Sequence, residues 1–523
     1  MVRMRRDVWK LGNDWDDAIL WYARAVKDLS ARPFADMTSW RYLAAMHGVS
    51  ETLWRHHGYL RAGEALPNAT AFQQQDRDQC QHHTWYFLPW HRGYLRAFEK
   101  IVAASIVKQG GPSDWALPYW NYNDLRNSHR LELPRAFGST TWPDPGPNPL
   151  FVKARYGLSG QSGRPIAIDN DSVELETALT EPDYVGASGG GSPGFGGGRT
   201  PFKHGARDRS DEGLLEQSPH DNVHGDIGGV LNNDFNNPLG GGLMSSPATA
   251  GLDPIFWLHH ANIDRVWEVW LKRPSGHQNP TSEEAWMGGP PGSRPFIMPE
   301  PDNSTRTAFS PDEMLDTSSP KLDYTYEDTS DPFPGADRLV ARLNNLGIAR
   351  PMSAAAMADK PQVELIGASA APLHLSGPQT EARVRLDDRA GPKMLRSFQP
   401  NSLAAGASPE PDRVFLNLEN VKGSSDGASF KVYVGLKPSE DPEQHPENMA
   451  GVVTLFGVHE ASAQDGSHGG NGLNKVVEIT KVVDRLHLDG VRELNEMPVR
   501  FVLRRGQASD IQIGRISIYR QGN

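Results

Sequence analysis

The chain has 523 residues, long enough for two or three domains, with 53 Lys and Arg against 64 Asp and Glu and a formal net charge of −11 at pH 7. This acidic balance excludes the global basic field of a nucleic-acid-binding protein, so no nucleic-acid partner is expected. No run of eighteen apolar residues occurs, so no membrane partner is expected either.

The N-terminal segment MVRMRRDVWKLGNDWDDAI has basic residues but neither an apolar core nor a small-residue cleavage site, so it is not a predicted signal peptide. Cys80 is the single cysteine, which excludes an intrachain disulfide and fits a reducing compartment. For the chain as written we therefore expect a cytoplasmic location, which a leader removed earlier would change.

Apolar residues recur at helical spacing in five segments, namely 14–30, 38–47, 92–108, 218–228 and 259–272. Between them, GASGGGSPGFGGG (186–198) is predicted to be a flexible surface loop because of its composition. It is not a phosphate-binding loop, because no Lys-Ser/Thr pair and no preceding strand accompany it.

The pattern changes after about residue 345. Short alternating runs punctuated by Gly, Asn and Asp follow at 413–421, 429–437, 451–458, 475–483, 499–505 and 511–519, and they predict an antiparallel β-sandwich. The predicted organisation is a mainly α domain with a four-helix-bundle core over 1–345, a linker over 346–361, and an all-β, sandwich-like domain over 362–523.

Histidines cluster in the first part of the chain. In SPHDNVHGDIGG, His220 and His224 are spaced i, i+4, so both imidazoles project from one face of a helix that starts near Ser218. In DPIFWLHHANIDRVW, His259 and His260 open a helix about 100° apart, so one can point at a given centre while the other makes a supporting hydrogen bond.

The stretch QCQHHTWYFLPWHRGYLRAFEK (79–100) adds His82 and His91. On one continuous helix these two would lie on opposite faces, but Pro89 is expected to break that helix and let His91 start a second one. His47, in AAMHG, could complete a first trio. Taken alone, the stretch is equally compatible with histidines that are satisfied core residues.

Two imidazole trios without matching carboxylates indicate which metal is bound. Di-iron bundles use Glu-x-x-His pairs, and structural zinc prefers thiolates together with His. Imidazole-only trios suit copper, which binds most tightly among the divalent ions. The sequence therefore predicts a dinuclear copper site, with two copper ions a few ångströms apart that bind O2.

HHTWYFLPWHRGYLRAFEK, HDNVH and DPIFWLHHANIDRVW resemble the two copper signatures of the type-3 copper proteins, which are tyrosinases, catechol oxidases and molluscan-type haemocyanins. The resemblance spans roughly residues 40–270. It implies one copper on His47, His82 and His91, and the other on His220, His224 and His260.

Other motifs extend the resemblance. LDYTYED (322–328) resembles the Tyr-x-Tyr element that closes the catalytic domain, and 429–437, 449–458 and 511–519 more weakly resemble the C-terminal domain of plant polyphenol oxidases. Cys80, two residues before His82, resembles the cysteine that fungal members join to the ligand ring by a thioether. The alternative is a small buried hydrophobic residue.

The activity implied by the resemblance is O2-dependent oxidation of a small phenol or catechol to an o-quinone, the precursor of melanin-type pigments. Phe256 is expected to line the pocket over the second copper, and Gly225 to leave the entrance open to bulky substrates. Where relatives that hydroxylate monophenols often have an Asn after the first helical His, this chain has Asp221, and Glu216 is the candidate for the accompanying Glu.

Three alternatives stay open. Monophenol hydroxylation and oxidation of catechols or o-aminophenols alone are both compatible with Asp221. A haemocyanin-like oxygen carrier is disfavoured because the chain has one site and no repeat. The C-terminal domain is expected to cover the copper pocket as a removable lid, the alternative being a second domain that only adds stability.

Overall fold

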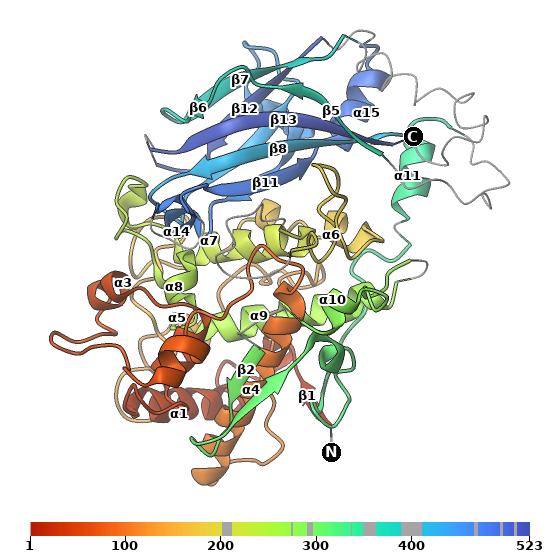
Figure 1. Cartoon of the computed structure of the whole chain (residues 1–523). Helices are drawn as coiled ribbons and strands as arrows, with labels where there is room; N and C mark the ends of the chain where they lie inside the picture. The colour runs from red at the N-terminus through yellow and green to blue at the C-terminus, as the bar shows by residue number, and fades with distance from the viewer. Residues whose placement is uncertain are drawn as a thin grey trace.

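A computed structural model describes residues 2–200, 212–273, 276–289, 296–335, 337–348, 362–388, 411–464, 469–491, 495–506 and 510–522. These residues form a helical part, and a β-rich part that lies across one end of it (Figure 1). The predicted fold class, a mainly α domain followed by a β-rich C-terminal domain, is confirmed. Across the described ranges, every helix is too short or too polar to span a bilayer.

The helical part is built on two long helices that pack against each other, α4 and α9, with α1 packed on α4. Its helices are α1 (Asp17–Ala31), α2 (Trp40–His47), α3 (Glu51–His56), α4 (Phe87–Lys108), α5 (Arg135–Gly138), α6 (Glu176–Thr180), α7 (Asn222–Gly228), α8 (Pro247–Ala250), α9 (Pro254–Leu271) and α10 (Glu284–Met287). Of the four helices that bring histidines together, α2 and α7 are short, with 8 and 7 residues.

Two predicted details around α4 are wrong. The helix begins at Phe87, so Pro89 lies in its first turn, where a missing N–H leaves no hydrogen bond unmade. His82 lies in a turn over 82–86 and not on a preceding helix. The chain therefore changes direction between His82 and His91 in the turn before α4, and Pro89 does not separate two helices.

The other two histidine pairs lie on helices close to those predicted. Helix α9 begins at Pro254, before the predicted start at 259, because the Asp253 side chain accepts a hydrogen bond from Ile255 N and caps it. The predicted helix over 218–228 is observed as η4 (Glu216–Asp221) continued by α7. Ser218 has extended backbone angles, so the helical conformation that carries both histidines resumes at Pro219.

A buried ionic cluster ties α4 to α9 close to the histidines. Arg92 Nε donates to Asp264 Oδ1 at 2.5 Å, and Tyr324 OH donates to Asp264 Oδ2 at 2.5 Å. Tyr324 belongs to β4 (Tyr324–Tyr326), which pairs in parallel with β1 (Arg3–Arg5). A second small sheet of the helical part is formed by β2 (Phe296–Pro299) and β3 (Arg306–Phe309), which pair antiparallel. Because Arg92 follows His91 and Asp264 lies one turn after His260, this pair fixes the two histidines relative to each other.

The β-rich part is one antiparallel sheet. Its strands are β5 (Gln362–Ala368), β6 (Leu373–His374), β7 (Gln379–Leu386), β8 (Arg413–Lys422), β9 (Ser429–Val434), β10 (Met449–Thr454), β11 (Leu473–Glu478), β12 (Glu496–Leu503) and β13 (Gln512–Gly522). They pair in the order β10-β9-β12-β7-β5-β13-β8-β11, with β6 on β13. The edge strands approach each other, since a Cβ at Gly451 of β10 would lie 3.6 Å from Val477 of β11. The antiparallel pairing is as predicted, but one curled sheet replaces the predicted sandwich of two sheets.

The run predicted as a strand over 475–483 is half strand and half helix. Strand β11 ends at Glu478, and α15 (Thr480–Leu488) follows directly. Val482, Val483 and the partly buried Leu486 face the domain core at helical spacing. In an apolar run this short, helical spacing cannot be told apart from the alternation of a strand. A second helix, α14 (Val458–Ser462), follows β10.

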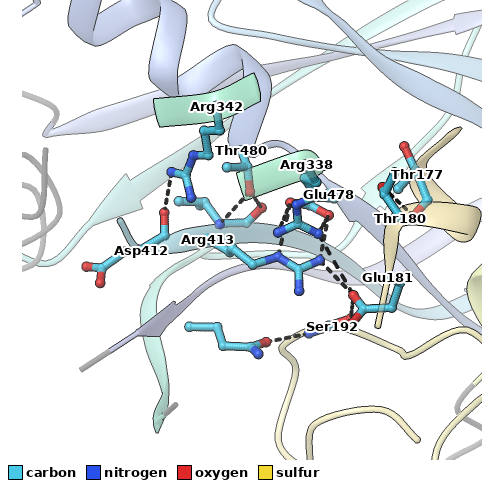
Figure 2. Close-up of polar contacts among 12 residues, drawn as sticks. Thr177, Thr180, Glu181, Ser192, Arg338, Arg342, Asp412, Arg413, Glu478 and Thr480 are labelled. Atoms are coloured by element: carbon cyan, nitrogen blue, oxygen red, sulfur yellow. Dashed lines mark hydrogen bonds and ion pairs between the residues drawn. The ribbon is translucent and has the colours of Figure 1, made fainter. Parts of the chain in front are cut away.

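Ion pairs join the two parts of the molecule. Figure 2 shows Arg413 of β8 between two glutamates: its Nη2 lies 2.9 Å from Glu181 of the helical part and 2.8 Å from Glu478 of β11. Ser192 Oγ donates to the same Glu181 carboxylate at 2.7 Å. Burial opposes ionisation of Glu181, but the Arg413 guanidinium holds the pKa of that carboxyl below its usual value. The interface is therefore charged and buried.

The glycine-rich segment 186–198 was predicted to be a flexible surface loop, and this prediction is wrong. Residues 190–198 are buried, and at their start Ser192 N donates to Gln521 Oε1 of β13 at 2.7 Å. A Cβ at Gly190, whose φ is +109°, would lie 2.6 Å from the Tyr519 ring. The glycines therefore allow the two parts to approach closely.

Helix α11 (Arg338–Asn345), at the end of the predicted first domain, contacts the β-rich part. Arg342 donates to Asp484 of α15 at 2.7 Å and to the carbonyl oxygens of Pro411 and Asp412 at 2.6 and 2.7 Å. Most of the predicted linker over 346–361 lies outside the described residues.

Candidate dinuclear metal site

The first predicted trio is assembled from α2, the turn before α4, and α4 itself. The potential ligand atoms of His47, His82, His91 and Cys80 all lie within 4.8 Å of one another, and all four residues are buried. The His47 and His82 rings are 4.9 Å apart between centroids, and those of His82 and His91 are 5.4 Å apart. The structure thus brings α2 against a turn and a helix that come much later in the sequence.

The second trio comes from η4, α7 and α9. His260 Nε2 lies 3.3 Å from His220 Nε2 and 3.3 Å from His224 Nε2. His259 also falls within 4.8 Å of this group, but its Nδ1 lies 3.1 Å from Tyr122 OH and its ring stacks on His220. Within the doublet, His260 converges on the other two histidines and His259 is hydrogen-bonded beside them.

The two clusters adjoin each other. The His91 and His260 rings stack at 4.6 Å with planes 16° apart, and the His82 and His220 rings are 5.6 Å apart. Two metal ions, one in each trio, would therefore be neighbours, as a dinuclear site requires.

Hydrogen bonds to the protein backbone set the tautomers of these histidines. Nδ1 of His47, His91 and His224 lies 2.8, 2.8 and 2.9 Å from the carbonyl oxygens of Pro247, Phe87 and Met244. A carbonyl oxygen only accepts, so each Nδ1 carries the proton and each Nε2 presents a lone pair. Lone pairs that converge in this way fit a metal ion, and the backbone contacts are the outer hydrogen bonds that orient metal-ligating histidines.

Burial keeps the imidazoles neutral. It lowers the pKa of His82, His91, His220, His224 and His260 well below the usual value, and neighbouring histidines add to the effect for each of them. Burial likewise lowers the pKa of His259 to about 3. A neutral imidazole is the form that ligates a metal, so the donor set fits two ions of borderline softness such as copper.

Cys80 lies against the first trio. Its Sγ is 3.3 Å from Nδ1 and 3.5 Å from Nε2 of His82, and it is fully buried. Because these two distances are nearly equal, Sγ lies close to the plane that bisects the line between the two nitrogens. That plane contains Cε1, the ring carbon between them. Burial raises the pKa of the Cys80 thiol well above its usual value.

Two phenylalanine rings of the helical part pack directly on the histidines. Phe256 lies 4.1 Å from the His260 ring and 4.9 Å from the His47 ring, between the two clusters and not over the second alone. Phe87, which the sequence analysis missed, packs at 4.5 Å on His91 and at 4.8 Å on His220.

A buried acidic cluster borders the second trio. Glu212 Oε1 lies 2.7 Å from His83 Nδ1, and Glu216 Oε1 accepts from His83 N at 2.8 Å. Asp221 Oδ1 lies 2.9 Å from His220 Nδ1, while its Oδ2 accepts from Lys475 Nζ at 2.7 Å. The predicted pair Glu216 and Asp221 therefore lies beside the histidines, together with Glu212 and Lys475, which the sequence analysis did not identify.

Burial, Glu212 and Asp221 together raise the pKa of Glu216 well above its usual value. Burial opposes ionisation of Glu212 as well, but the Lys475 ammonium and His83 lower the pKa of that carboxyl to about 2. Burial also raises the pKa of Asp221 well above its usual value, against the opposing effect of Lys475. Within the cluster, Glu212 is therefore the carboxyl whose ionised form the surroundings favour.

The C-terminal part covers the site. Phe456, in the turn after β10, is fully buried and packs at 4.4 Å on the His224 ring and at 5.3 Å on the His82 ring. A Cβ at Gly225 would lie 2.8 Å from Thr454 Cγ2. Gly225 therefore does not leave an open entrance in this structure, because the segment after β10 occupies the space.

Phe456 and Lys475 carry different sequence signals. Phe456 lies in the apolar run GVVTLFGV, where nothing separates it from a core residue. Lys475 lies between Leu473 and Val477 on the buried face of β11. A charged residue at an inward position of an alternating strand is unusual, and this is the sequence signal that could have identified Lys475.

Comparisons with known proteins agree with this site. The family model described as the common central domain of tyrosinase matches residues 37–187 and 155–273, and a domain of unknown function (DUF7868) matches residues 362–521. A tyrosinase of Hahella sp. (strain CCB-MM4) is 31% identical over 99% of this chain and 99% of its own length. A chloroplastic polyphenol oxidase of Malus domestica is 28% identical over 48% of this chain and 39% of its own length.

Solved structures share the fold of the whole chain. A latent aurone synthase (polyphenol oxidase) matches with a TM-score of 0.60 and 20% identity, covering 100% of this chain and 90% of that chain. Latent apple tyrosinase matches with a TM-score of 0.56 and 19% identity, covering 99% and 97%. Because the match to the Hahella tyrosinase extends over nearly all of both chains and the tyrosinase model spans every candidate histidine ligand, the chain belongs to the tyrosinase family of copper enzymes that oxidise phenols.

Proposed function

We propose that this chain binds two copper ions, one on His47, His82 and His91 and one on His220, His224 and His260, and uses O2 to hydroxylate monophenols and to oxidise o-diphenols to o-quinones. The observation that carries the proposal is the convergence of the Nε2 atoms, with His260 Nε2 3.3 Å from two of its neighbours. When bound, the copper pair supplies the two-electron chemistry with O2.

The residues around the histidines exclude water and hold the ligands. Phe256 and Phe87 are fully buried against the rings, so the site is dry and substrate contacts act at low dielectric. His259, hydrogen-bonded to Tyr122 and stacked on His220, fixes the orientation of that ligand ring. These residues act by positioning.

Hydroxylation of a monophenol requires a group that accepts the phenol proton. Glu216 is the candidate for this role because it is buried, its Oε1 is held by His83 N, and its Oε2 has no hydrogen-bond partner among the described residues. The raised pKa of Glu216 makes its carboxylate a stronger base than an ordinary carboxylate. Glu216 must release its own proton before it can accept the phenol proton. Asp221 is held by Lys475 in this structure and is therefore less available.

Cys80 and His82 are the second part of the proposal. A thioether between Sγ and Cε1 replaces the S–H and C–H bonds by one C–S bond and releases two protons and two electrons; O2 would accept them and form H2O2, and bound copper would supply the redox chemistry. The short distances from Sγ to both ring nitrogens support this product. A fixed ring would hold the His82 ligand in position before the metal binds.

Oxygen uptake by the copper-loaded protein with tyrosine, dopamine and o-aminophenol tests the proposal. We expect uptake with dopamine and with tyrosine, the latter after a lag. Uptake with dopamine or o-aminophenol but not with tyrosine would show that the chain is an oxidase that does not hydroxylate monophenols. Reversible O2 binding without turnover of any phenol would instead favour an oxygen carrier and overturn the proposal.

A further inference from the structure

Lys475 reaches from the C-terminal part into the acidic cluster beside the second trio. The alternation of β11 places it on the buried face with Leu473 and Val477. Its Nζ donates to Glu212 Oε1 and Oε2 at 2.8 and 2.7 Å and to Asp221 Oδ2 at 2.7 Å. An alkylammonium has three N–H bonds, and these three acceptors match them in number.

Without Lys475 the cluster would be an unpaired anionic site. Glu212, Glu216 and Asp221 are all buried, and Lys475 is the cation that the described structure places among them. Glu216 Oε2 has no hydrogen-bond partner among the described residues, so the cluster has acceptor capacity beyond what Lys475 uses. When Lys475 is withdrawn with the C-terminal part, these carboxyl groups lose their cation and are free to accept the N–H groups of another one.

An aromatic ring from the same C-terminal part contacts the histidine that neighbours this carboxylate–ammonium pair. Phe456 packs against the His224 ring at 4.4 Å and against the His220 ring at 5.8 Å. His220 is also the residue whose Nδ1 lies 2.9 Å from Asp221, the carboxylate that binds Lys475. His220 is thus contacted both by this aromatic ring and by the carboxylate that binds Lys475.

We propose that Phe456 and Lys475 occupy the places of the ring and the ammonium group of a substrate, and that the uncovered site selects phenols with a cationic alkylamine chain, bound through Glu212 and Asp221. The inference rests on the proposed function, because it names the class of phenol that the site oxidises. Neutral catechols lack the ammonium group, and catechols with a carboxylate chain meet like charges at Glu212 and Asp221.

A binding experiment tests the inference without turnover. The full-length Phe456→Ala/Lys475→Ala variant vacates both places, and phenethylamine, which has no hydroxyl group to be oxidised, supplies a ring and an ammonium group. Calorimetry on the copper-free variant should show phenethylamine binding at least about tenfold more tightly than neutral 2-phenylethanol, with anionic 3-phenylpropionate weakest. The preference should disappear when Glu212→Gln is added. Equal binding of the amine and the alcohol would overturn the inference.

Kinetics on the wild-type chain provide a second test if the double variant does not fold. With the C-terminal part loosened by low detergent, kcat/KM should be about tenfold higher for dopamine than for 4-ethylcatechol, and lower again for 3-(3,4-dihydroxyphenyl)propionate. Glu212→Gln should bring the ratio of dopamine to 4-ethylcatechol toward one. Asp171→Asn, which removes a different ion pair between the two parts at Lys431, should keep the wild-type ratio.

The two proposals fail in different ways. If no catechol is oxidised, the proposed function is wrong, and the calorimetric preference still reports on the amine site. If all three catechols are oxidised with equal kcat/KM, the oxidase stands and the inference about the amine is wrong.

Discussion

The ring of Phe456 stacks on the imidazole of His224, with centroids 4.4 Å apart and planes 28° apart. Phe456 belongs to the C-terminal part in sequence but to the apolar core of the helical part in space. Conversely, Val230 and Phe235 belong to the helical part in sequence but pack in the core of the β-rich part. The two parts are therefore interlocked, and a phenol cannot reach His224 while Phe456 remains there.

Replacing Phe456 by Ala should raise the catechol oxidase activity of the intact chain several-fold, because it opens space over His224 without removing a ligand. Nicking near 351–361, mild acid or low detergent should have a similar effect, largest for bulky phenols, at constant copper content. Leu455→Ala is the matched control, since Leu455 is buried in the β-rich core and loses packing there instead. If opened and intact chains oxidise catechol equally fast, the C-terminal part only adds stability.

Replacing His91 or His224 by Ala should abolish oxidase activity and lower the copper content, because each substitution removes one of three ligands from one ion. Metal analysis together with circular dichroism would show copper loss with the fold kept. His260→Ala should have the same effect, whereas His259→Ala should cost about 10- to 100-fold in activity, as for a residue that only orients a ligand. The reverse order for the doublet would show that His259 is the ligand.

Copper-matured wild-type protein should weigh two hydrogens less than expected from its sequence, whereas Cys80→Ser protein treated in the same way should show no such loss. No internal disulfide can account for the difference, because the chain has a single cysteine. Intact-mass analysis and thiol titration measure it. A thiol that titrates fully after copper loading and turnover would show that Cys80 stays free.

Replacing Glu216 by Gln should lower the hydroxylation of tyramine by about 100-fold or more, the usual contribution of a general base. Oxidation of dopamine should fall much less, because a catechol gives up its protons more readily than a monophenol. The ratio of the two rates in an activated preparation is the measurement. A parallel loss of both activities would assign Glu216 to the support of His83 and not to proton transfer.

Acid should weaken the contact between the two parts through Glu212. The pKa of this carboxyl is lowered from 4.5 to about 2 in the folded protein, so its pairing with Lys475 stabilises the closed chain fully above about pH 4.5. That stabilisation is lost progressively as the pH falls toward 2. Activity after brief acid exposure, assayed at neutral pH, should therefore rise over this interval. In Glu212→Gln the rise should be shallower, and an unchanged profile would exclude Glu212 as the group responsible.

The local sequence was sufficient for much of the site. The i, i+4 spacing of His220 and His224 determines that both rings lie on one helix face, and the 100° between His259 and His260 determines that their rings point in different directions. Alternating apolar runs likewise determined most strands of the C-terminal part. These features depend on residues within a few positions of one another, so helix and strand geometry alone is enough to predict them.

Tertiary structure decided what covers the site. Lys475 and Asp221 are 254 residues apart, and no periodicity marks them as partners. Phe456 is indistinguishable in sequence from a core residue of its own domain. Residues 190–198 have the composition of a surface loop yet are buried, with Gly190 against Tyr519 of β13. Packing between segments distant in sequence determines these contacts, because a buried charge or ring takes its partner from whichever surface the fold places against it.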